Sequence, residues 1–518
     1  MCYAFAVEQP ARQLETSRTL QRRAWRASRW QASWWLLALY SIFLLAATSY
    51  IARHRHLWFD EIDTLFIGTL PNLKAIWNVL LLGTDGQPIG FYVPVHLSYL
   101  LFGASEFSAR LCGIVPFWLT TLVLYYAVSR RTSPLYGFVA ALSLPCTVGF
   151  QYAFEARPYA LVLLFSACSF VAWQFAKEGR RRILALLALA ITLAAAISVH
   201  YNAVLIAIPI LIGELAYTIR KRNIDWGVVM AICASGLPIL FLLPHIHAIQ
   251  VYSKSYWSHT TFGALSDIYF ALFTKFIVFV MLGCAAAGFW AGLSRKRSRS
   301  INAEFGALPF HELAAAGAYF LLPLACFVLS FYTKALHYRY VIATVIGVSL
   351  FVPFILWIFR SILPAVTAVL CAVLVVNLLI TALIRMTISD ENTWGAYVNY
   401  SELFDPTKEI YQSKQALVLG DGPFLVIAKY GNSTLRDRSF YLLNKARPTN
   451  SEIVFRGLRN AVQGPFNLVE LGEFERAHRS FLMYDPESWL LNQILAEGNL
   501  VTVRANWVHG PLYEVTVR

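Results

Sequence analysis

The feature of this sequence that most constrains its fold is a series of long apolar runs separated by short clusters of arginine and lysine. A membrane-spanning helix needs about 20 mostly apolar residues, and about eleven runs approach that length. They lie at 34–51, 111–128, 135–151, 158–175, 183–199, 203–219, 226–243, 268–292, 313–331, 340–359 and 362–384. Only 14% of the 518 residues are charged, too few to cover the surface of a soluble protein of this length. The sequence therefore predicts a polytopic α-helical membrane protein.

The net charge of +14 is unevenly distributed along the chain. From residue 385 onward there are 14 Lys and Arg against 15 Asp and Glu, whereas the first 384 residues hold 29 against 14. The basic excess lies in short clusters between the apolar runs, such as KEGRRR at 177–182 and RKRSR at 295–299. Such clusters are typical of loops that stay in the cytoplasm rather than of a nucleic-acid-binding surface.

A twelfth apolar run, 91–102, is short, and the basic clusters indicate where it lies. If the N-terminus is inside and this run does not cross, the basic clusters from 130–131 to Arg360 all fall inside. We therefore expect 91–102 to form an interfacial helix on the outer face. Counting the crossings in the same way places the following segments on the outer side: 52–90, 155–157, 245–267, 337–339 and the tail from residue 385.

The chain divides into three predicted parts. These are a basic cytoplasmic N-terminus at 1–33, a transmembrane domain at 34–384 with an outer catalytic loop at 52–110, and an extracytoplasmic domain at 385–518. In the tail, 415–420 and 480–484 are typical of strands, 486–498 of a helix, and 509–511 of the turn of a closing hairpin. We expect a small α/β domain. Gly420-Asp421-Gly422 resembles the start of a dinucleotide fingerprint but lacks the third glycine, so no nucleotide site is predicted there.

Acidic residues are concentrated where this topology places the outer edge of the membrane. Asp60 and Glu61 follow the first span closely, and Glu155 and Arg157 occupy a short turn between two spans. A carboxylate at this depth is costly and suits a general base, although the start of a hydrated loop would also carry acids. Glu155 and Arg157 have a structural alternative as well, a clamp in which they pair with each other.

Further polar residues are expected on the same face. Arg339 and Tyr340 begin a span there, and a guanidinium among aromatic side chains suits phosphate binding, with snorkelling as the alternative. Snorkelling is the favoured interpretation of Arg110. The other members of the set are Asp85, Gln87, Tyr92, His200 and Tyr201.

Five further histidines are also predicted outside, namely His54, His56, His245, His247 and His259. Interfacial histidines are the favoured interpretation, because metal ligands must converge in space and the sequence does not show convergence. The sequence indicates no certain cofactor and leaves the use of a divalent metal open.

These motifs, taken in order, resemble a known group of enzymes. WFDE (58–61) is followed by D-x-Q-P-x-x-F-Y (85–92), S-E-F-S-A-R-L (105–111), E-A-R-P-Y (155–159) and the R-Y at 339–340. The sequence resembles the GT-C-fold glycosyltransferases related to protein O-mannosyltransferases and the lipid A aminoarabinose transferase. One departure is that relatives usually have a histidine or lysine before two prolines, where this chain has Gln87-Pro88-Ile89.

The resemblance implies transfer of a sugar from a polyprenyl-phosphate carrier to a glycolipid, glycan or protein acceptor, with inversion, at the outer face of a bacterial inner membrane. It implies that Asp60 is the catalytic base, with Glu61 beside it. Arg157, Arg339 and Tyr340 are then candidates for binding the donor phosphate, and Glu155, Asp85, Gln87, Tyr92, His200 and Tyr201 for contacting substrate.

The alternatives to this enzyme are a secondary transporter or lipid flippase and a membrane acyltransferase. A secondary transporter or lipid flippase should place ionisable groups near the middle of the membrane, where this chain has few, notably Glu214 and Lys275. A membrane acyltransferase would call for a histidine inside the membrane, and here the histidines lie mainly at the edges of the runs.

Overall fold

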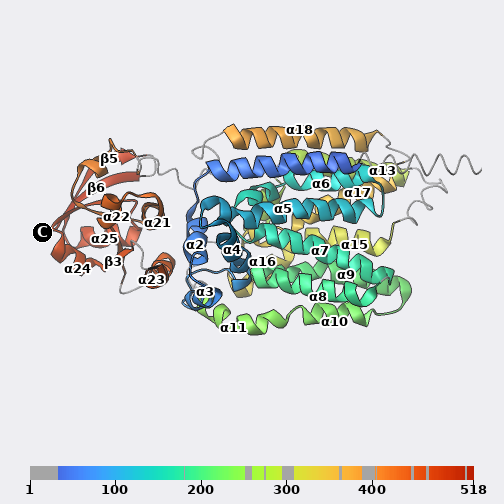
Figure 1. The fold of residues 1–518 in the computed structure, drawn as a ribbon, viewed down its shortest axis with the longest axis horizontal. Coiled ribbons are helices and arrows are strands. Elements are labelled where there is room, and N and C mark those ends of the chain that lie inside the picture. The colour runs from blue at the N-terminus through green and yellow to red at the C-terminus, as the bar shows by residue number, and fades with distance from the viewer. Residues whose placement is uncertain are drawn as a thin grey trace, which may run out of the picture.

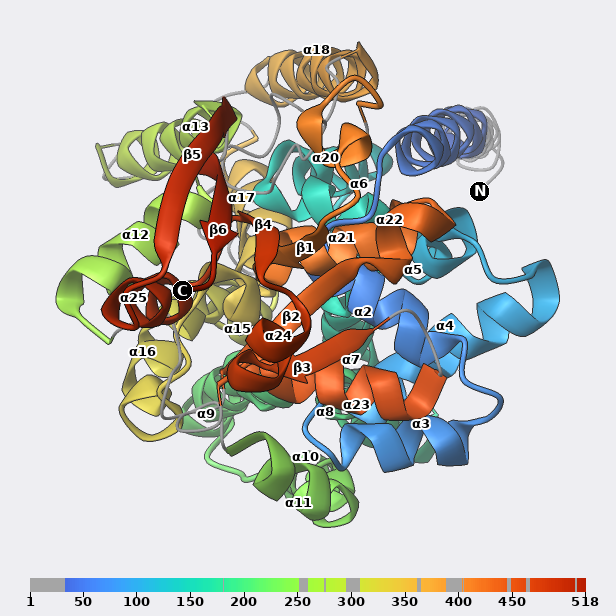
Figure 2. The same cartoon turned by 90° about the vertical axis from the view of Figure 1, so that its left-hand side faces the viewer.

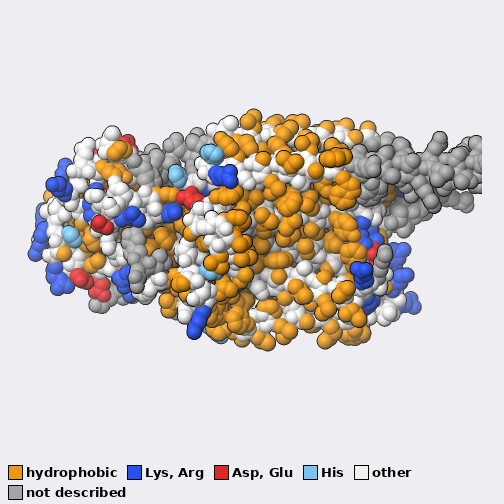
Figure 3. Space-filling model, viewed as in Figure 1, with side chains coloured by type: hydrophobic (Ala, Val, Ile, Leu, Met, Phe, Trp, Pro, Cys, Tyr) orange, Lys and Arg blue, Asp and Glu red, His pale blue; other side chains and the backbone are white. Residues whose placement is uncertain are grey.

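The computed structural model describes residues 33–179, 181–250, 260–273, 276–294, 308–360, 365–387, 403, 405–444, 449–462, 466–507 and 510–518. A bundle of long helices makes up most of it, and a small domain built on a β-sheet lies at one end of the bundle (Figure 1). Hydrophobic side chains cover the sides of the bundle, whereas lysines and arginines gather at the end away from the small domain (Figure 3). This distribution is that of an integral membrane protein.

Eight helices in the described part of the chain are long and apolar enough to cross a membrane. They are Ser33–His54, Glu106–Ser129 (α5), Tyr159–Glu178 (α7), Arg182–Val199 (α8), Tyr201–Lys221 (η3, Tyr201–Ile206, with α9, Ala207–Lys221), Trp226–Ile249 (α10, Trp226–Ala234, with α11, Leu237–Ile249), Phe310–Thr333 (α15, Phe310–Ala318, η5, Tyr319–Leu321, and α16, Leu322–Thr333) and Val366–Thr387 (α18).

A bent pair of helices counts as a ninth span only when its two parts are taken together. The helices Pro134–Cys146 (α6, Pro134–Ser143, and η1, Leu144–Cys146) and Val148–Phe154 (η2) meet at 75°. The run 135–151 was expected to be one span. It breaks because Pro145 lacks an N–H for the helical ladder and because the Thr147 side chain accepts a hydrogen bond from Gly149 N at 3.1 Å, which caps a new turn.

The two remaining predicted runs correspond to shorter apolar helices. Val278–Trp290 lies within α13 (Phe276–Ser294), and α17 spans Thr344–Ile358. Helix α12 (Phe262–Leu272) and the turn η6 (Tyr338–Val341) complete the helical part. Each of the eleven runs thus contains a helix, although the prediction of about eleven spans exceeds the eight or nine that meet the length criterion among the described residues.

Three helices form the end of the bundle that faces the small domain (Figures 1 and 2). They are α2 (Phe59–Gly68), α3 (Leu73–Leu80) and α4 (Ile89–Phe102). Helix α4 corresponds to the predicted interfacial helix and has 14 residues, fewer than a span requires.

The small domain contains one six-stranded sheet with the order β3-β2-β1-β4-β6-β5. The first four strands in this order run parallel, and β6 and β5 add an antiparallel edge. The strands are β1 (Ala416–Leu419), β2 (Ser439–Leu443), β3 (Asn467–Glu470), β4 (Ser480–Tyr484), β5 (Leu500–Trp507) and β6 (Gly510–Thr516). The helices are α20 (Glu409–Gln412), α21 (Asp421–Tyr430), α22 (Ser433–Asp437), α23 (Asn450–Val462), α24 (Leu471–Ala477) and α25 (Ser488–Ala496).

The predicted α/β class of this domain is confirmed, as are its first and fourth strands, the helix after the fourth and the closing hairpin. Strands β2 and β3 and helix α23 were not foreseen. Helix α23 packs on α2 and α3 of the bundle, and the rings of Phe455 and Phe59 lie 6.3 Å apart. A second ring contact joins Phe466 to Phe66 at 5.4 Å. The small domain is therefore anchored on the element that carries Asp60.

Candidate functional site

Asp60 lies in the first turn of α2, where the helix dipole favours an acidic side chain. Its Oδ2 is 3.5 Å from Nη2 of Arg157 and 3.4 Å from Nη1 of Arg339. Asp60 keeps 23% of its side chain exposed, whereas Arg157 keeps 5% and Arg339 13%. Residues 60, 157 and 339 come from separate parts of the chain, so the tertiary structure creates a carboxylate that faces two nearly buried guanidinium groups.

Arg157 links Asp60 to a second carboxylate. Its Nη1 lies 3.6 Å from Oδ2 of Asp85 and donates hydrogen bonds to the Asp60 carbonyl at 3.1 Å and to Oγ1 of Thr64 at 3.3 Å. The residue directly precedes Pro158, the N-cap of α7, so its backbone is held at the start of a rigid helix. The expected alternative, a clamp between Glu155 and Arg157, is not formed, because Asp60 and Asp85 take up the guanidinium instead.

Glu61 points away from this cluster. Its carboxylate is 1% exposed and accepts two hydrogen bonds at 2.8 Å from Nε and Nη2 of Arg110 and one at 2.7 Å from Ala156 N. It also accepts one from Trp58 N at 3.3 Å, which closes the first turn of α2. A carboxylate bonded on all sides is poorly placed to take a proton, so the geometry favours a positioning role for Glu61 rather than the predicted catalytic one.

Arg110 does not snorkel, contrary to the favoured interpretation of the sequence. It is 2% exposed, and besides Glu61 it donates to the carbonyls of Ala52, Arg55 and His56. It thereby fixes the end of the first helix and the start of α2 in one arrangement. The sequence signal that could have identified it is its position at the outer start of a span, beside a loop whose buried carboxylate needs a partner.

Asp85 is held by Tyr92 and His245, and His245 is in turn in contact with Tyr201. Tyr92 of α4 donates to its Oδ2 at 2.5 Å, and Nε2 of His245 lies 2.9 Å from its carbonyl oxygen. Nδ1 of His245 is in turn 2.7 Å from the hydroxyl of Tyr201. His245 is fully buried, so it belongs to the site rather than to the membrane interface that was expected for it.

Aromatic rings border the arginines. His200 lies 5.4 Å from Tyr340 and 5.6 Å from Tyr159, measured between ring centroids. Burial and the nearby charges of Arg157 and Arg339 lower the pKa of His200 to about 3, so its ring is neutral. Arg339 also lies 5.9 Å from the ring centroids of Tyr340 and Trp58. Aromatic rings, one of them an uncharged imidazole, therefore border the Arg339 side of the site.

Several buried polar atoms at the site have no hydrogen-bond partner. They are Oδ1 of Asp63, Oε1 of Gln87, Oε2 of Glu155 and Nε of Arg157. Burial, and secondarily the neighbouring Glu61, raises the pKa of Glu155 to about 8, so this residue is protonated at neutral pH. Unsatisfied buried groups are rare in folded proteins, and a concentration of them indicates a place where a ligand or water binds.

The structure therefore brings most of the predicted residues together. Asp60, Asp85, Arg157, Arg339 and Tyr92 form one cluster of contacts, His200 and Tyr340 border it, and Tyr201 joins it through His245. Gln87 and Glu155 are buried in the same region. No group of three or more His, Cys, Asp or Glu able to hold a metal occurs among the described residues, which include His54, His56 and His247 but not His259.

Comparisons with known proteins cover both the sequence and the fold. Residues 86–247 match the family described as dolichyl-phosphate-mannose-protein mannosyltransferase. The structure is similar to ArnT from Cupriavidus metallidurans in the apo state, with a TM-score of 0.53 and 13% identity over 94% of this chain and 98% of that chain. It is similar to the same protein bound to undecaprenyl phosphate, with a TM-score of 0.53 and 14% identity over 93% and 98% of the two chains. No curated protein matches the sequence.

Proposed function

We propose, on the premise that this chain has the GT-C fold of integral-membrane glycosyltransferases, that it transfers a sugar from a polyprenyl-phosphate carrier to an acceptor hydroxyl. The observation that carries the proposal is the pair of nearly buried guanidinium groups that both lie within 3.5 Å of Oδ2 of Asp60. A base next to two fixed cations is what this reaction requires.

The proposed chemistry is a single displacement. The acceptor oxygen attacks the anomeric carbon of the donor sugar while Asp60 takes the proton of the acceptor hydroxyl. The bond between the anomeric carbon and the phosphate oxygen breaks, and polyprenyl phosphate leaves with the electron pair. Because attack and departure occur on opposite faces of the carbon, the configuration inverts.

Arg157 and Arg339 stabilise the charge that develops on the leaving phosphate, because guanidinium groups match the geometry of phosphate oxygens. Tyr340 borders Arg339 and restricts its movement. Glu61 and Arg110 hold the first turn of α2 so that Asp60 keeps its orientation. Asp85, Tyr92, Gln87, Glu155, His200 and Tyr201 contact the sugar or shape the space around it.

The site lies at the end of the bundle that carries the sheet domain, and the basic residues gather at the other end (Figures 1 and 3). Basic clusters mark the cytoplasmic side, so we place the site and the C-terminal domain in the periplasm of a bacterium with the chain in its inner membrane. Single cysteines at positions 222 and 437 test this orientation. An impermeant thiol reagent applied to intact spheroplasts should label position 437 and not position 222, and the reverse pattern would contradict it.

Glu214, the acidic residue inside a predicted span, does not support the alternative that the protein is a secondary transporter. Glu214 accepts hydrogen bonds from Trp173 and from Lys177, and Lys177 also pairs with Asp225. These partners lie toward the basic end of the bundle, where they form a structural ion-pair network. Lys275 lies outside the described residues.

The central test is Asp60→Asn, compared with Asp437→Asn on the exposed surface of the C-terminal domain. Glycolipids and glycoproteins of a deletion strain and its parent, compared by mass spectrometry, identify the transferred sugar and its acceptor. Each variant is then expressed in the deletion strain, and its sugar transfer is measured in the same way. Loss of the base should lower transfer by about 10²–10⁴-fold while the protein still folds and inserts. Full transfer by the Asp60 variant would refute the assignment of the base.

A further inference from the structure

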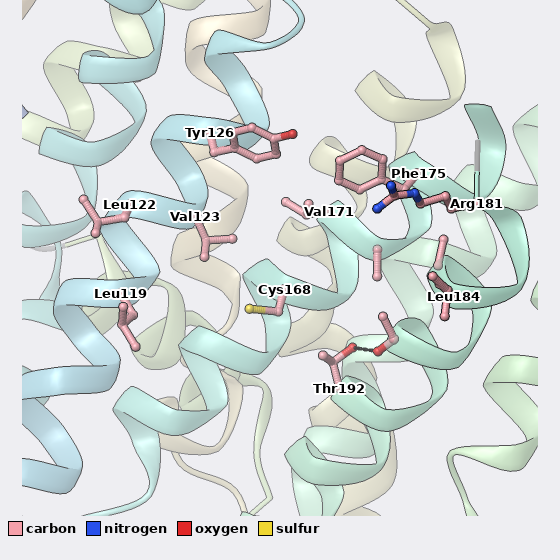
Figure 4. Close-up of a pocket in the computed structure, with 13 residues that line it drawn as sticks. Leu119, Leu122, Val123, Tyr126, Cys168, Val171, Phe175, Arg181, Leu184 and Thr192 are labelled. Carbon is pink, nitrogen blue, oxygen red and sulfur yellow. Dashed lines mark hydrogen bonds between the residues drawn. The ribbon is translucent and has the colours of Figure 1, made fainter. Parts of the chain in front are cut away.

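An apolar groove of about 790 Å³ lies on the bundle far from the Asp60 site. It runs between α5, α7 and α8, and Figure 4 shows its lining. The lining includes Tyr126 near the end of α5, Phe175 near the end of α7 and Leu184 near the start of α8. These ends belong to the basic side of the bundle, whereas Asp60 and the C-terminal domain lie at the opposite side (Figures 1 and 3).

The groove faces the membrane. Leu184, which lines the groove, is exposed by 62% although it is apolar, and Leu187 and Ile191 on the same helix outside the lining are exposed by 53% and 65%. In an integral membrane protein such a surface contacts acyl chains, and a concave part of it retains a chain longer because more of the chain is in contact with protein. The groove therefore suits the hydrocarbon part of a lipid.

Two arginines lie at the basic end of the groove. Arg181 is part of the lining and is the N-cap of α8, with φ of +50°. No carboxylate pairs with Arg181 among the described residues. The guanidinium of Arg130 lies 4.0 Å from the centroid of the Phe175 ring, and although its Nη2 pairs with Glu178 at 2.6 Å, its Nη1 is buried with no hydrogen-bond partner. Cationic groups at the end of an apolar groove match a ligand with an anionic head and a hydrocarbon tail.

We infer that this groove binds one anionic phospholipid of the leaflet at the basic end, with an acyl chain along α5, α7 and α8 and the phosphate on Arg181. The polyprenyl carrier is also an anionic lipid. It is not the proposed occupant, because its phosphate must reach Asp60 at the other end of the bundle. The site is separate from the Asp60 site, and only the choice of a phospholipid over the polyprenyl carrier rests on the proposed function.

Native mass spectrometry of the full-length protein, released from detergent after addition of phosphatidylglycerol or phosphatidylcholine, tests the inference. The wild-type protein should retain one phosphatidylglycerol in preference to phosphatidylcholine. Arg181→Gln should lower the apparent affinity for phosphatidylglycerol about fivefold. The matched control is Arg222→Gln, which removes the same charge at the basic end from a residue that also has positive φ but does not line the groove.

A second variant tests the apolar part. Ala188→Phe fills the groove without changing charge and should reduce retention of the same lipid, with the melting temperature reporting whether the variant folds. Equal losses in the Arg181 and Arg222 variants would overturn the site. Displacement of the bound phosphatidylglycerol by undecaprenyl phosphate would overturn the choice of occupant. Asp60→Asn should leave lipid retention unchanged, so failure of the proposed function would be distinguishable.

Discussion

Gly457 of the C-terminal domain packs directly against Thr84, the residue before Asp85, so closely that an added Cβ at position 457 would overlap the threonine hydroxyl. Thr84 is fully buried and donates a hydrogen bond to the Val79 carbonyl at 2.9 Å, so it has little room to move. A second contact lies on the other side of the site, where Leu57 N donates to the Tyr430 hydroxyl at 2.8 Å. The C-terminal domain thus contacts the segments that carry both Asp85 and Asp60.

The first prediction follows from this packing. Gly457→Ala should lower the melting temperature and reduce sugar transfer about tenfold, because overpacking at a rigid contact costs about 1–3 kcal/mol and displaces the Asp85 segment. Gly472→Ala is the control, since a Cβ at position 472 meets no atom within 4 Å. If both variants behave alike, the contact at Thr84 has no role in holding the site.

Arg339→Ala should raise the apparent KM for the lipid-linked donor far more than that for the acceptor. Removing one partner of a buried charge pair costs about 2–5 kcal/mol, and in the proposed mechanism Arg339 contacts the donor phosphate. Arg360→Ala provides a control, because Arg339 lies in η6 before the start of α17 whereas Arg360 follows the end of α17. An unchanged donor KM in the Arg339 variant would remove that residue from the phosphate site.

Arg110→Lys tests the positioning role of the pair formed by Arg110 and Glu61. Lysine keeps the charge but lacks the planar fork that donates two hydrogen bonds to one carboxylate. We expect kcat to fall about 10–100-fold with little change in either KM, because α2 loses its fixed orientation while the substrate contacts remain. A fall in melting temperature with unchanged kcat would indicate a purely structural role.

The pKa of Glu155 leads to a prediction about pH. Burial raises this pKa to about 8 in the folded protein, so between the ordinary glutamate range and pH 8 the folded state holds a proton that the unfolded state has lost. Stability should therefore decrease as pH rises through this interval and level off above about pH 8. Glu155→Gln should flatten the dependence of the melting temperature on pH, whereas Glu473→Gln at an exposed position should leave it unchanged.

Removal of divalent metal ions with a chelator tests whether sugar transfer requires a metal. Arg157 and Arg339 already supply positive charge beside Asp60, so transfer by the purified protein should persist in about millimolar EDTA. Restoration of a lost activity by Mg²⁺ or Mn²⁺ alone would show that a cation takes part and that the arginines do not suffice.

The helical membrane class, the approximate position of every described span and the α/β class of the tail followed from the sequence, because apolar length and strand periodicity are local properties. The bend between α6 and η2 depends on local residues as well, yet it was missed, since Pro145 and Thr147 lie within a continuous apolar run. Strands β2 and β3 are short and lie in segments without clear alternation.

Charge distribution and the order of motifs predicted that the candidate residues lie on one face, and in the structure most of them are close together. Their partners were not predicted. The sequence left open a clamp between Glu155 and Arg157 and favoured an Arg110 that extends to the membrane surface. In the fold, Arg157 pairs with Asp60 and Asp85, and Arg110 is buried against Glu61.

The sequence by itself determined which segments are apolar and how basic clusters divide the loops, and it predicted which polar residues share one face of the membrane domain. The tertiary structure alone decided that Asp60 faces two arginines, that Glu61 is enclosed and that the C-terminal domain rests on Phe59 and Thr84. The physical reason is that composition and hydropathy act on each segment separately. Ion pairing in a buried site instead depends on distances between side chains that are far apart in the chain, as Asp60 is from Arg157 by 97 positions and from Arg339 by 279.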